Sequence, residues 1–462
     1  MTYRWANRCC RVDWPSGACY VLREMNIIQI TPGAGKMFCG ACMRDNALVA
    51  ELRKLGHSVV MIPLYLPLTL DEEDQSAGTP TFFGGINVYL QQQSAIFRKL
   101  PSWLHNLLAS PTLLKLAAGS AGKTRAQDLG EMTLSILRGE QGNQARELDE
   151  LIVWLKTQPV DLICLSNALL AGLARRLRAE LNVPVVCSLQ GEDWFLDSLP
   201  EKHRALAWQT LAERAREVDL FIAPSHCFGE LMRKRLGFAA DKLKVVPNGI
   251  HLDGYKGVQS SEFKVQSSPV LGYFARMCAE KGINDLVEAY LILRQRGKKL
   301  KLKIGGSCGP ADEPVVNSLK QKLEAREVLG DVEFHPNTDR AGKIAFLKSL
   351  TVFSVPALYG EGFGLYVIEA MAAGVPVVEP DTAAFPELLA DTGGGVICPP
   401  GNPIALADAI ERLLADPARA RALGEAGQKA VFEKFSAAKM AEQIAAVYFD
   451  ALQHFPLVNR PS

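Results

Sequence analysis

Short apolar runs rich in β-branched residues alternate with amphipathic stretches along almost the whole chain, and this alternation restricts the fold more than any other feature. In the first half, runs that predict strands lie at 26–30, 58–63, 162–165, 183–189, 220–223 and 244–246. Amphipathic stretches at 46–55, 143–157, 169–181, 203–218 and 225–236 predict helices. Strands that are apolar throughout are typical of a parallel sheet covered by helices on both faces.

A second series of the same kind comes after a polar, serine-rich segment at 258–269. Its predicted strands lie at 270–273, 301–304, 332–334, 352–355, 375–379 and 395–397. A chain of 462 residues is too long for one ordinary domain. We therefore expect an α/β protein with two doubly wound domains, at 25–256 and 270–434, joined by a linker at 257–269. A last helix, within 435–462, is expected to pack back on the first domain.

The first 24 residues differ from the rest of the chain. They hold three cysteines, two tryptophans and four arginines without a clear period, whereas residues 25–30 predict a strand. We interpret 1–24 as a non-native or disordered extension, with Met25 as the natural start.

The region 70–130 also departs from the alternation. Residues 69–75 are acidic, and the stretch 97–118 is largely apolar with basic flanks. One interpretation is a helical insertion packed on the first domain. The other is a lid that binds the acceptor, or an element that lies on a membrane surface.

Composition excludes several functional classes. With 51 basic and 50 acidic residues the net charge is +1, which argues against a nucleic-acid-binding protein. No run of 18 apolar residues predicts a transmembrane helix. The 11 cysteines, an odd number without an evident signal peptide, predict reduced thiols in the cytoplasm. If the stretch 97–118 meets a membrane, the protein would sit peripherally at its cytoplasmic face.

The stretch Glu361-Gly-Phe-Gly-Leu-Tyr-Val-Ile-Glu369 places two carboxylates eight positions apart around a glycine loop. Good helix formers without proline at 365–373 predict a helix that begins just after this loop. The N-terminus of such a helix offers unpaired N–H groups to an anion. The arrangement therefore suits a site that binds sugar hydroxyls and a phosphate together.

Two basic residues come after the first predicted strand of the second domain, in Arg276-Met-Cys-Ala-Glu-Lys281-Gly282. A diphosphate needs paired cations, and Arg276 and Lys281 could both face one. Basic residues at this spacing are, however, more often a solvated pair on the surface.

A glycine loop, Thr31-Pro-Gly-Ala-Gly-Lys36, comes after the first strand of the first domain. It is not a P-loop, because Lys36 precedes a methionine and the glycine spacing differs. Cys39 and Cys42 come next, and they supply two ligands where zinc needs four. We therefore interpret Cys39 and Cys42 as small residues at the start of a helix, beside a ligand-binding loop. The alternative is that one of them is a reactive thiol.

Taken in this order, the motifs resemble those of the family-4 glycosyltransferases, retaining enzymes of the GT-B fold. Further matching pieces are Pro247-Asn-Gly-Ile250, Ala370-Met-Ala-Ala-Gly-Val-Pro-Val377 and the turn Pro386-Glu-Leu-Leu. The resemblance runs from about residue 25 to the C-terminus and is most specific in the second domain. It implies two Rossmann-like domains that face each other across a deep cleft. The nucleotide sugar would bind mainly to the second domain and the acceptor to the first, with no metal or other cofactor.

The resemblance also implies a role for each matching residue. Arg276 and Lys281 would neutralise the diphosphate as it leaves. Glu361 would contact the donor sugar near its anomeric carbon, and Glu369 would accept hydrogen bonds from the ribose hydroxyls. The other nucleotide-sugar-binding residues would be Gly362, Phe363, Gly364 and Leu365, with His335 and Asn337 near the base and Gly33 and Gly35 near the phosphates.

One position departs from the family pattern. Many members carry a histidine after the fourth strand, where this chain has Gln190. Glutamine can hydrogen-bond a sugar hydroxyl but cannot carry a proton. Gln190, Glu192, Asp193 and Lys36 are therefore the candidates for the acceptor side of the site.

These expectations combine into one predicted activity. The chain would move a hexosyl group from a UDP- or GDP-sugar to a hydroxyl of a glycan, a lipid or a small molecule, with retention and without a metal. In the front-face mechanism of the family, the departing phosphate oxygen takes the acceptor proton. The alternatives are a non-catalytic protein that binds sugar nucleotides or glycans, and an epimerase or phosphorylase on the same fold.

Overall fold

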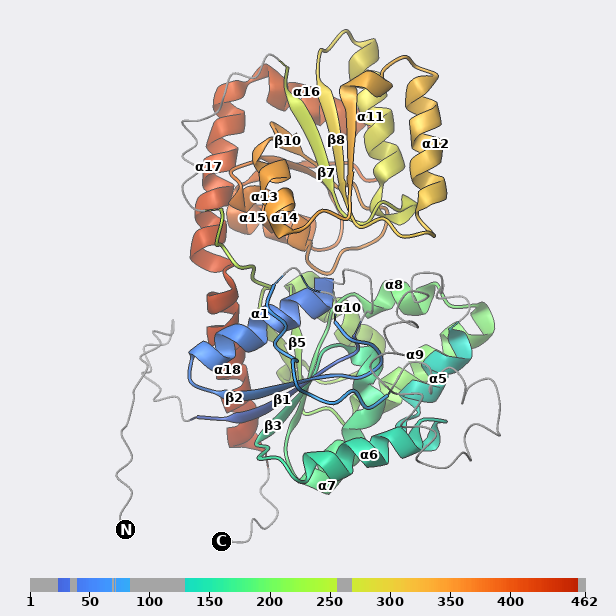
Figure 1. The fold of residues 1–462 in the computed structure, drawn as a ribbon, viewed down its shortest axis with the longest axis vertical. Helices are drawn as coiled ribbons and strands as arrows, with labels where there is room; N and C mark the ends of the chain where they lie inside the picture. The colour runs from blue at the N-terminus through green and yellow to red at the C-terminus, as the bar shows by residue number, and fades with distance from the viewer. Residues whose placement is uncertain are drawn as a thin grey trace.

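The computed structural model describes residues 24–33, 40–68, 70, 72–83, 129–255 and 268–455 (Figure 1). Within these ranges the chain forms two α/β domains, each built on a parallel sheet of six strands. The predicted α/β class with two doubly wound domains is therefore confirmed. Residues 1–23, most of the linker and of the region 70–130, and Gly35, Lys36 and Cys39 lie outside the described residues.

The first sheet has the strand order β2-β1-β3-β4-β5-β6. Its strands are β1 (Asn26–Thr31), β2 (Ser58–Pro63), β3 (Leu162–Leu165), β4 (Val185–Ser188), β5 (Leu220–Ala223) and β6 (Leu243–Val245). Successive side chains point to opposite faces, so Ile28 belongs to one buried cluster and its neighbour Ile27 to another. Both faces are covered, which explains why the strands are apolar throughout.

Helices cover the two faces of the first sheet. On one face lie α1 (Gly40–Lys54) and the C-terminal α18 (Ala437–His454), which pack on each other. The other α-helices among the described residues of this domain are α5 (Gly130–Leu137), α6 (Ala145–Leu155), α7 (Ala174–Leu181), α8 (Glu192–Asp197), α9 (Glu201–Ala215) and α10 (His226–Leu236).

The second sheet has the order β12-β11-β10-β7-β8-β9. Its strands are β7 (Val270–Phe274), β8 (Lys301–Gly306), β9 (Val332–Pro336), β10 (Val352–Phe353), β11 (Val377–Pro380) and β12 (Gly395–Cys398). Read from β9 to β12, this is the Rossmann order, whose direction reverses between β7 and β10. The helices of this domain are α11 (Ile283–Gln295), α12 (Glu313–Glu324), α13 (Arg340–Lys348), α14 (Leu365–Ala372), α15 (Phe385–Thr392), α16 (Pro403–Ala415) and α17 (Pro417–Lys434).

The chain crosses between the domains twice, and the two crossings are bonded to each other. The Ile250 N–H donates to the Phe435 carbonyl (3.0 Å), and the Ala437 N–H donates to the Ile250 carbonyl (2.8 Å). From there α18 continues along the first domain, below α17 in Figure 1. The last helix therefore belongs to the core of the first domain, where Ile444 and Tyr448 are fully buried.

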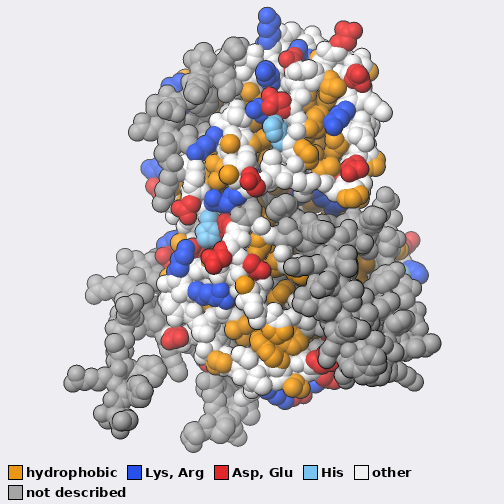
Figure 2. All heavy atoms as spheres, in the orientation of Figure 1, with side chains coloured by type: hydrophobic (Ala, Val, Ile, Leu, Met, Phe, Trp, Pro, Cys, Tyr) orange, Lys and Arg blue, Asp and Glu red, His pale blue; other side chains and the backbone are white. Residues whose placement is uncertain are grey.

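The described part of the region 70–130 is not helical before Gly130. Residues 72–83 form turns and bends, and α5 begins the next element. Within the described ranges, no helix combines the length and apolar character needed to cross a bilayer. On the face shown in Figure 2, acidic and basic side chains mix over both domains, in keeping with a net charge of +1.

The loop that leaves β7 depends on a close backbone approach, which gives a test of the fold. Gly282 has φ +71°, and a Cβ there would lie 1.7 Å from the Pro356 carbonyl oxygen, in the segment after β10. Gly297 has a similar φ of +77° but open space around it. We expect Gly297→Ala to lower the free energy of unfolding by about 1 kcal/mol and Gly282→Ala by about 3 kcal/mol, because only the latter adds overlap. Chemical denaturation measures both, and equal losses would contradict the close approach.

Candidate active site

The loops after β7 and β10 meet at the point where the strand order of the second sheet reverses. Lys281 ends the short helix η8 (Ala279–Lys281) after β7, and Glu361 lies in the loop after β10. The Leu358 N–H donates to the Glu280 carbonyl (3.0 Å) and joins the two loops. Ligands of open α/β sheets bind at this position, outside the carboxyl ends of the strands.

Lys281 and Glu361 form an ion pair there. Their side chains are 17% and 13% exposed, so water screens the pair weakly. The Lys281 ammonium also lies over the rings of Tyr359 and Tyr366, 5.0 and 5.3 Å from their centroids. Burial, helped by the Glu361 carboxylate, raises the pKa of Tyr359 and keeps its phenol protonated. The pair places a cation and a carboxylate side by side in a half-buried site.

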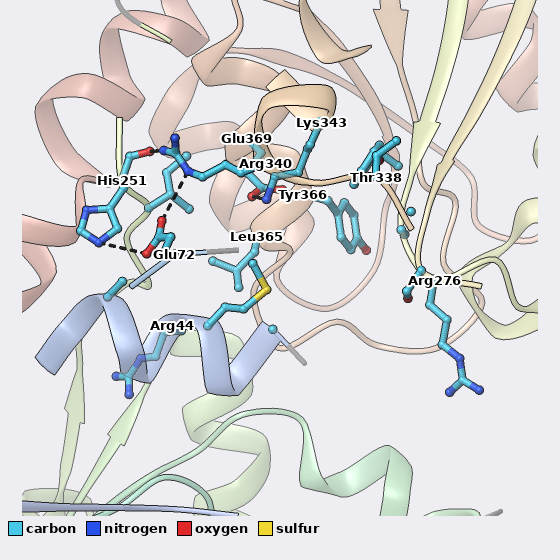
Figure 3. Close-up of a pocket in the computed structure, with 18 of the residues that line it drawn as sticks. Arg44, Glu72, His251, Arg276, Thr338, Arg340, Lys343, Leu365, Tyr366 and Glu369 are labelled. Carbon is cyan, nitrogen blue, oxygen red and sulfur yellow. Dashed lines mark hydrogen bonds and ion pairs between the residues drawn. The ribbon is translucent and has the colours of Figure 1, made fainter. Parts of the chain in front are cut away.

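Arg276 has a different partner. Its guanidinium binds the buried Asp312 carboxylate at 3.0–3.1 Å, and Asp312 also accepts the Gly309 N–H. Arg276 is 44% exposed, and in Figure 3 its guanidinium points away from Lys343 and Glu369. The structure thus places Arg276 and Lys281 on the same loop but gives each its own carboxylate.

Glu369 is paired with a residue that sequence reasoning missed. On α14 its carboxylate lies 2.7 Å from the ammonium of Lys343 on α13, with exposed fractions of 17% and 10%. No motif contains Lys343, and the two residues are 26 positions apart in the chain. Packing of α13 against α14 brings them together. The lysine holds the carboxylate in one orientation, as recognition of two neighbouring hydroxyls requires.

The start of α14 is open to an anion. Its N-cap, Gly364, has φ +93°, and no side chain caps the helix. Leu365 lines the cavity between the domains and faces the start of α1, where a Cβ at Gly40 would lie 3.6 Å from it. The Phe363 ring is instead buried in the core near Phe435 (6.0 Å), so its backbone, not its ring, is available to a ligand.

A cavity of about 200 Å³ lies between the domains (Figure 3). It is bordered by the first turns of α1, by the crossing segment near Ile250, and by Arg276, Lys343 and Glu369 of the second domain. At one edge, Glu72 of the first domain approaches Arg340 (3.4 Å) and His251 (3.3 Å). Of the predicted site residues, Arg276, Asn337, Leu365 and Glu369 border this space, which both domains enclose, whereas Lys281 and Glu361 do not line it.

Two residues predicted near the nucleobase differ in position. Asn337 lines the cavity, and its side chain holds the backbone of Cys308 through two hydrogen bonds of 2.9 Å. His335, on the edge strand β9, binds Glu333 (3.2 Å), packs against Phe346 and does not border the cavity. Only Asn337 is thus placed where the structure offers room for a base.

On the first domain, a buried arginine organises the floor of the cleft. Arg44, 2% exposed, binds Asp45 (2.8 Å), Ser188 (3.4 Å) and Asn248 (3.3 Å). Asn248 in turn donates to the side chain of Gln190 (3.3 Å). The side chain of Gln190 is therefore oriented by a hydrogen-bond network that runs through Asn248 to Arg44 on α1. Sequence reasoning missed Arg44, because its partners come from distant segments.

Glu192 has a structural role rather than the expected contact with the acceptor. Both its oxygens accept backbone N–H groups, from Ala168 (2.8 Å) and Gln190 (2.9 Å), and the side chain is buried. Asp193 is also buried, and its Oδ1 has no hydrogen-bond partner among the described residues. Of the two, Asp193 retains an atom that a ligand could use.

The backbone at Gly33 lies close to the segment that follows β2, and this position requires a glycine. It has φ +78°, and a Cβ there would lie 1.9 Å from the Leu66 carbonyl oxygen. Gly33 does not border the cavity, and the rest of its loop lies outside the described residues. Cys42 is buried in α1 and is not part of a disulfide.

The burial of Glu192 predicts a dependence of stability on pH. Desolvation raises the pKa of Glu192 from the ordinary 4.5 to about 7, although the two N–H donors oppose the shift. Between these values the folded state keeps a proton that the unfolded chain has released, so stability falls as pH rises from about 4.5 to about 7. We expect the stability of the wild type relative to Glu192→Gln to fall by about 3 kcal/mol over this range. Denaturation at several pH values measures the difference, with exposed Glu201→Gln as the control for loss of one carboxylate. A difference that does not change with pH would show that Glu192 is ionised in the fold throughout.

Comparison with known proteins matches both domains. A family model described as glycosyl transferases group 1 matches residues 258–430, and one described as glycosyltransferase family 4 matches residues 132–253. A phosphatidyl-myo-inositol mannosyltransferase of Mycobacterium leprae (strain TN) is 32% identical over 208 residues. The match covers 44% of this chain and 52% of that protein, so the chain spans about half the length of this relative.

Solved structures share the whole fold. Sucrose-phosphate synthase of Thermosynechococcus elongatus superimposes with a TM-score of 0.66 at 19% identity, over 93% of this chain and 100% of that chain. HepE of Anabaena in complex with UDP gives 0.63 at 17% identity, over 92% and 100%. At such identities the likeness concerns the fold, which is GT-B. With one family model on each domain, the motifs at Arg276, Lys281, Glu361 and Glu369, and this fold, the chain belongs to the family-4 glycosyltransferases.

Proposed function

We propose that the protein transfers a hexosyl group from a nucleoside diphosphate sugar to an acceptor hydroxyl, with retention of the anomeric configuration. The observation that carries this proposal is the ion pair of Lys281 and Glu361 beside the uncapped start of α14. The bond between the anomeric carbon and the diphosphate oxygen breaks, and a bond from that carbon to the acceptor oxygen forms on the same face. The acceptor proton passes to the departing diphosphate.

The chain's own groups meet the electrostatic demands of this reaction. Negative charge grows on the diphosphate as the sugar leaves, and Lys281 with the N–H groups of α14 lies where that charge develops. Arg276 can add a second cation by turning from Asp312, since its side chain is half exposed. Glu361, freed from Lys281 by the incoming diphosphate, can accept hydrogen bonds from the sugar hydroxyls. On this basis we propose that transfer needs no metal ion.

The nucleotide would lie in the cavity between the domains. Glu369, oriented by Lys343, would accept both ribose hydroxyls, and Asn337 borders the space left for the base. Either a UDP- or a GDP-sugar fits this proposal. The Anabaena HepE structure, which shares the fold and holds UDP, supports UDP as the first donor to test.

The acceptor would approach from the first domain. Gln190 and Asp193 lie at the exit of β4, on the side that faces the second domain, and Asp193 has an unused oxygen. We propose that these side chains bind acceptor hydroxyls. None of the described cysteines is in a disulfide, which supports the proposal that the protein works in the cytoplasm.

Removal of either member of the central pair should strongly impair transfer. We expect Lys281→Ala and Glu361→Ala to lower turnover by roughly 100-fold or more, because each removes a group at the reacting centre. Release of UDP or GDP in the presence of an acceptor panel measures this, with exposed Lys301→Ala as the matched control. Near-normal turnover in a folded variant would refute the assignment.

Turnover of the wild type that survives EDTA supports the metal-free reaction, and loss of turnover in EDTA argues against it.

Nucleotide binding can be tested without knowing the acceptor. We expect either UDP or GDP to raise the melting temperature more than ADP, because a ligand that binds the folded state stabilises it. Glu369→Gln should weaken that shift by removing one acceptor of the ribose hydroxyls, whereas Glu333→Gln, on the outer strand, should not.

Sugar-phosphate release with inorganic phosphate would indicate a phosphorylase instead. Nucleotide-sugar binding without turnover on any acceptor would indicate a binding protein.

A further inference from the structure

The loop that carries Glu361 is in contact with the first domain on both sides. Ser225, which precedes α10, donates its hydroxyl to the Gly362 carbonyl (2.8 Å). On the other side, the Trp194 ring of α8 stacks on the Tyr359 ring, with centroids 5.1 Å apart and planes at 29°. Figure 1 shows α8 and α10 at the end of the first domain that faces α14 and α15. Glu361 therefore stands between two contacts that cross the cleft.

Ser225 performs two tasks with one hydroxyl. Its oxygen accepts the Phe228 N–H (3.2 Å) as the N-cap of α10, while its proton goes to Gly362. The residue is 3% exposed, so water does not compete for either bond. Phe228 adds packing, because its ring lies 3.3 Å from where a Cβ at Gly362 would be. The hydrogen bond from Ser225 and the packing of the Phe228 ring together fix the position of the Glu361 loop relative to α10.

A carboxylate of the second domain completes the contact. Glu387, in the first turn of α15, accepts the N–H groups of His226 (2.8 Å) and Cys227 (3.0 Å) at the start of α10. These N–H groups have no partner within their own helix, and the positive end of the helix dipole favours a carboxylate there. The second domain thus caps a helix of the first.

The same helix α15 is joined to Glu361. The N–H of Ala384, just before α15, donates to the Glu361 carbonyl (3.2 Å). A continuous path therefore runs from α10 through Glu387 and α15 to the backbone of Glu361. Tyr359 gives a second path, because its ring contacts both the Trp194 ring and the Lys281 ammonium. Displacement of the first domain would release this loop from both paths.

We propose that Ser225 and Glu387 are positioning residues, which hold Glu361 in its working place only while the first domain is docked on the second. The inference rests on the proposed glycosyl transfer and adds to it how the site is assembled. Glu369 and Lys343, which would recognise the ribose, both belong to the second domain and do not contact Ser225 or Glu387 in the ion pair that they form. Loss of the docking contact should therefore slow the transfer step and leave donor binding almost unchanged.

The experiment compares contacts that cross the cleft with similar contacts that do not. Glu387→Ala and Ser225→Ala remove the crossing contacts. Asp416→Ala and Asn402→Ala are the matched controls, since each removes a side chain that caps a helix within the second domain, through the Arg419 and Ala405 N–H groups (3.0 Å each). Ser225→Thr keeps both the cap and the donor and should rescue activity.

We expect kcat to fall roughly tenfold in Glu387→Ala and Ser225→Ala, with the KM for the donor within about twofold of the wild type. The two controls and Ser225→Thr should keep kcat. Control-like kcat in both crossing variants, or a loss that appears in KM alone, would overturn the proposal. Melting curves of all five variants identify a loss that comes from unfolding.

A second measurement does not depend on turnover. Small-angle X-ray scattering with saturating UDP or GDP should give a larger radius of gyration for Glu387→Ala than for Asp416→Ala, because the domains separate. Equal radii would contradict the docking role even if transfer is slowed. If the wild type transfers no sugar from any donor, the proposed function fails, while the scattering result still decides whether these residues hold the domains together.

Discussion

The position of β7 beside β10 is the constraint on which the site depends. At this point the order of the second sheet reverses, and ligands of open α/β sheets bind there, outside the carboxyl ends of the strands. Lys281 comes from one loop and Glu361 from the other, and a close approach at Gly282 keeps the loops in contact. Each strand therefore supplies one charge to a pair that neither could form alone.

Two chain crossings and a polar seam connect this site to the first domain. The crossings are bonded to each other near Ile250, which limits how the domains can move relative to one another. Across the cleft, Ser225 and Glu387 use groups that would otherwise be unpaired at the start of α10. The stack of Trp194 on Tyr359 and the packing of Phe228 against Gly362 add apolar contacts to these hydrogen bonds. Such an interface suits domains that must separate to exchange ligands.

Much of the fold could be predicted from sequence, but less of the site. All twelve apolar runs proposed as strands coincide with strands, because burial on both faces leaves a strong pattern. Of the motif residues, Glu369 borders the cavity between the domains, and Lys281 and Glu361 pair at the point where the strand order reverses. Asp312, the partner of Arg276, and Lys343, the partner of Glu369, were not found, because the start of α12 and the helix α13 bring them from elsewhere in the chain.

Sequence alone determined the class of each element, the two-domain division and the residues whose motifs come from one continuous loop or helix start. These features arise from the local periodicity of apolar residues and from the backbone conformation of single loops and helix starts, both of which a short segment determines by itself. Tertiary structure decided which carboxylate meets which cation, that Glu192 is occupied by backbone N–H groups, and that the Phe363 ring belongs to the core. Pairing and burial depend on strand order and domain docking, and no local pattern encodes these.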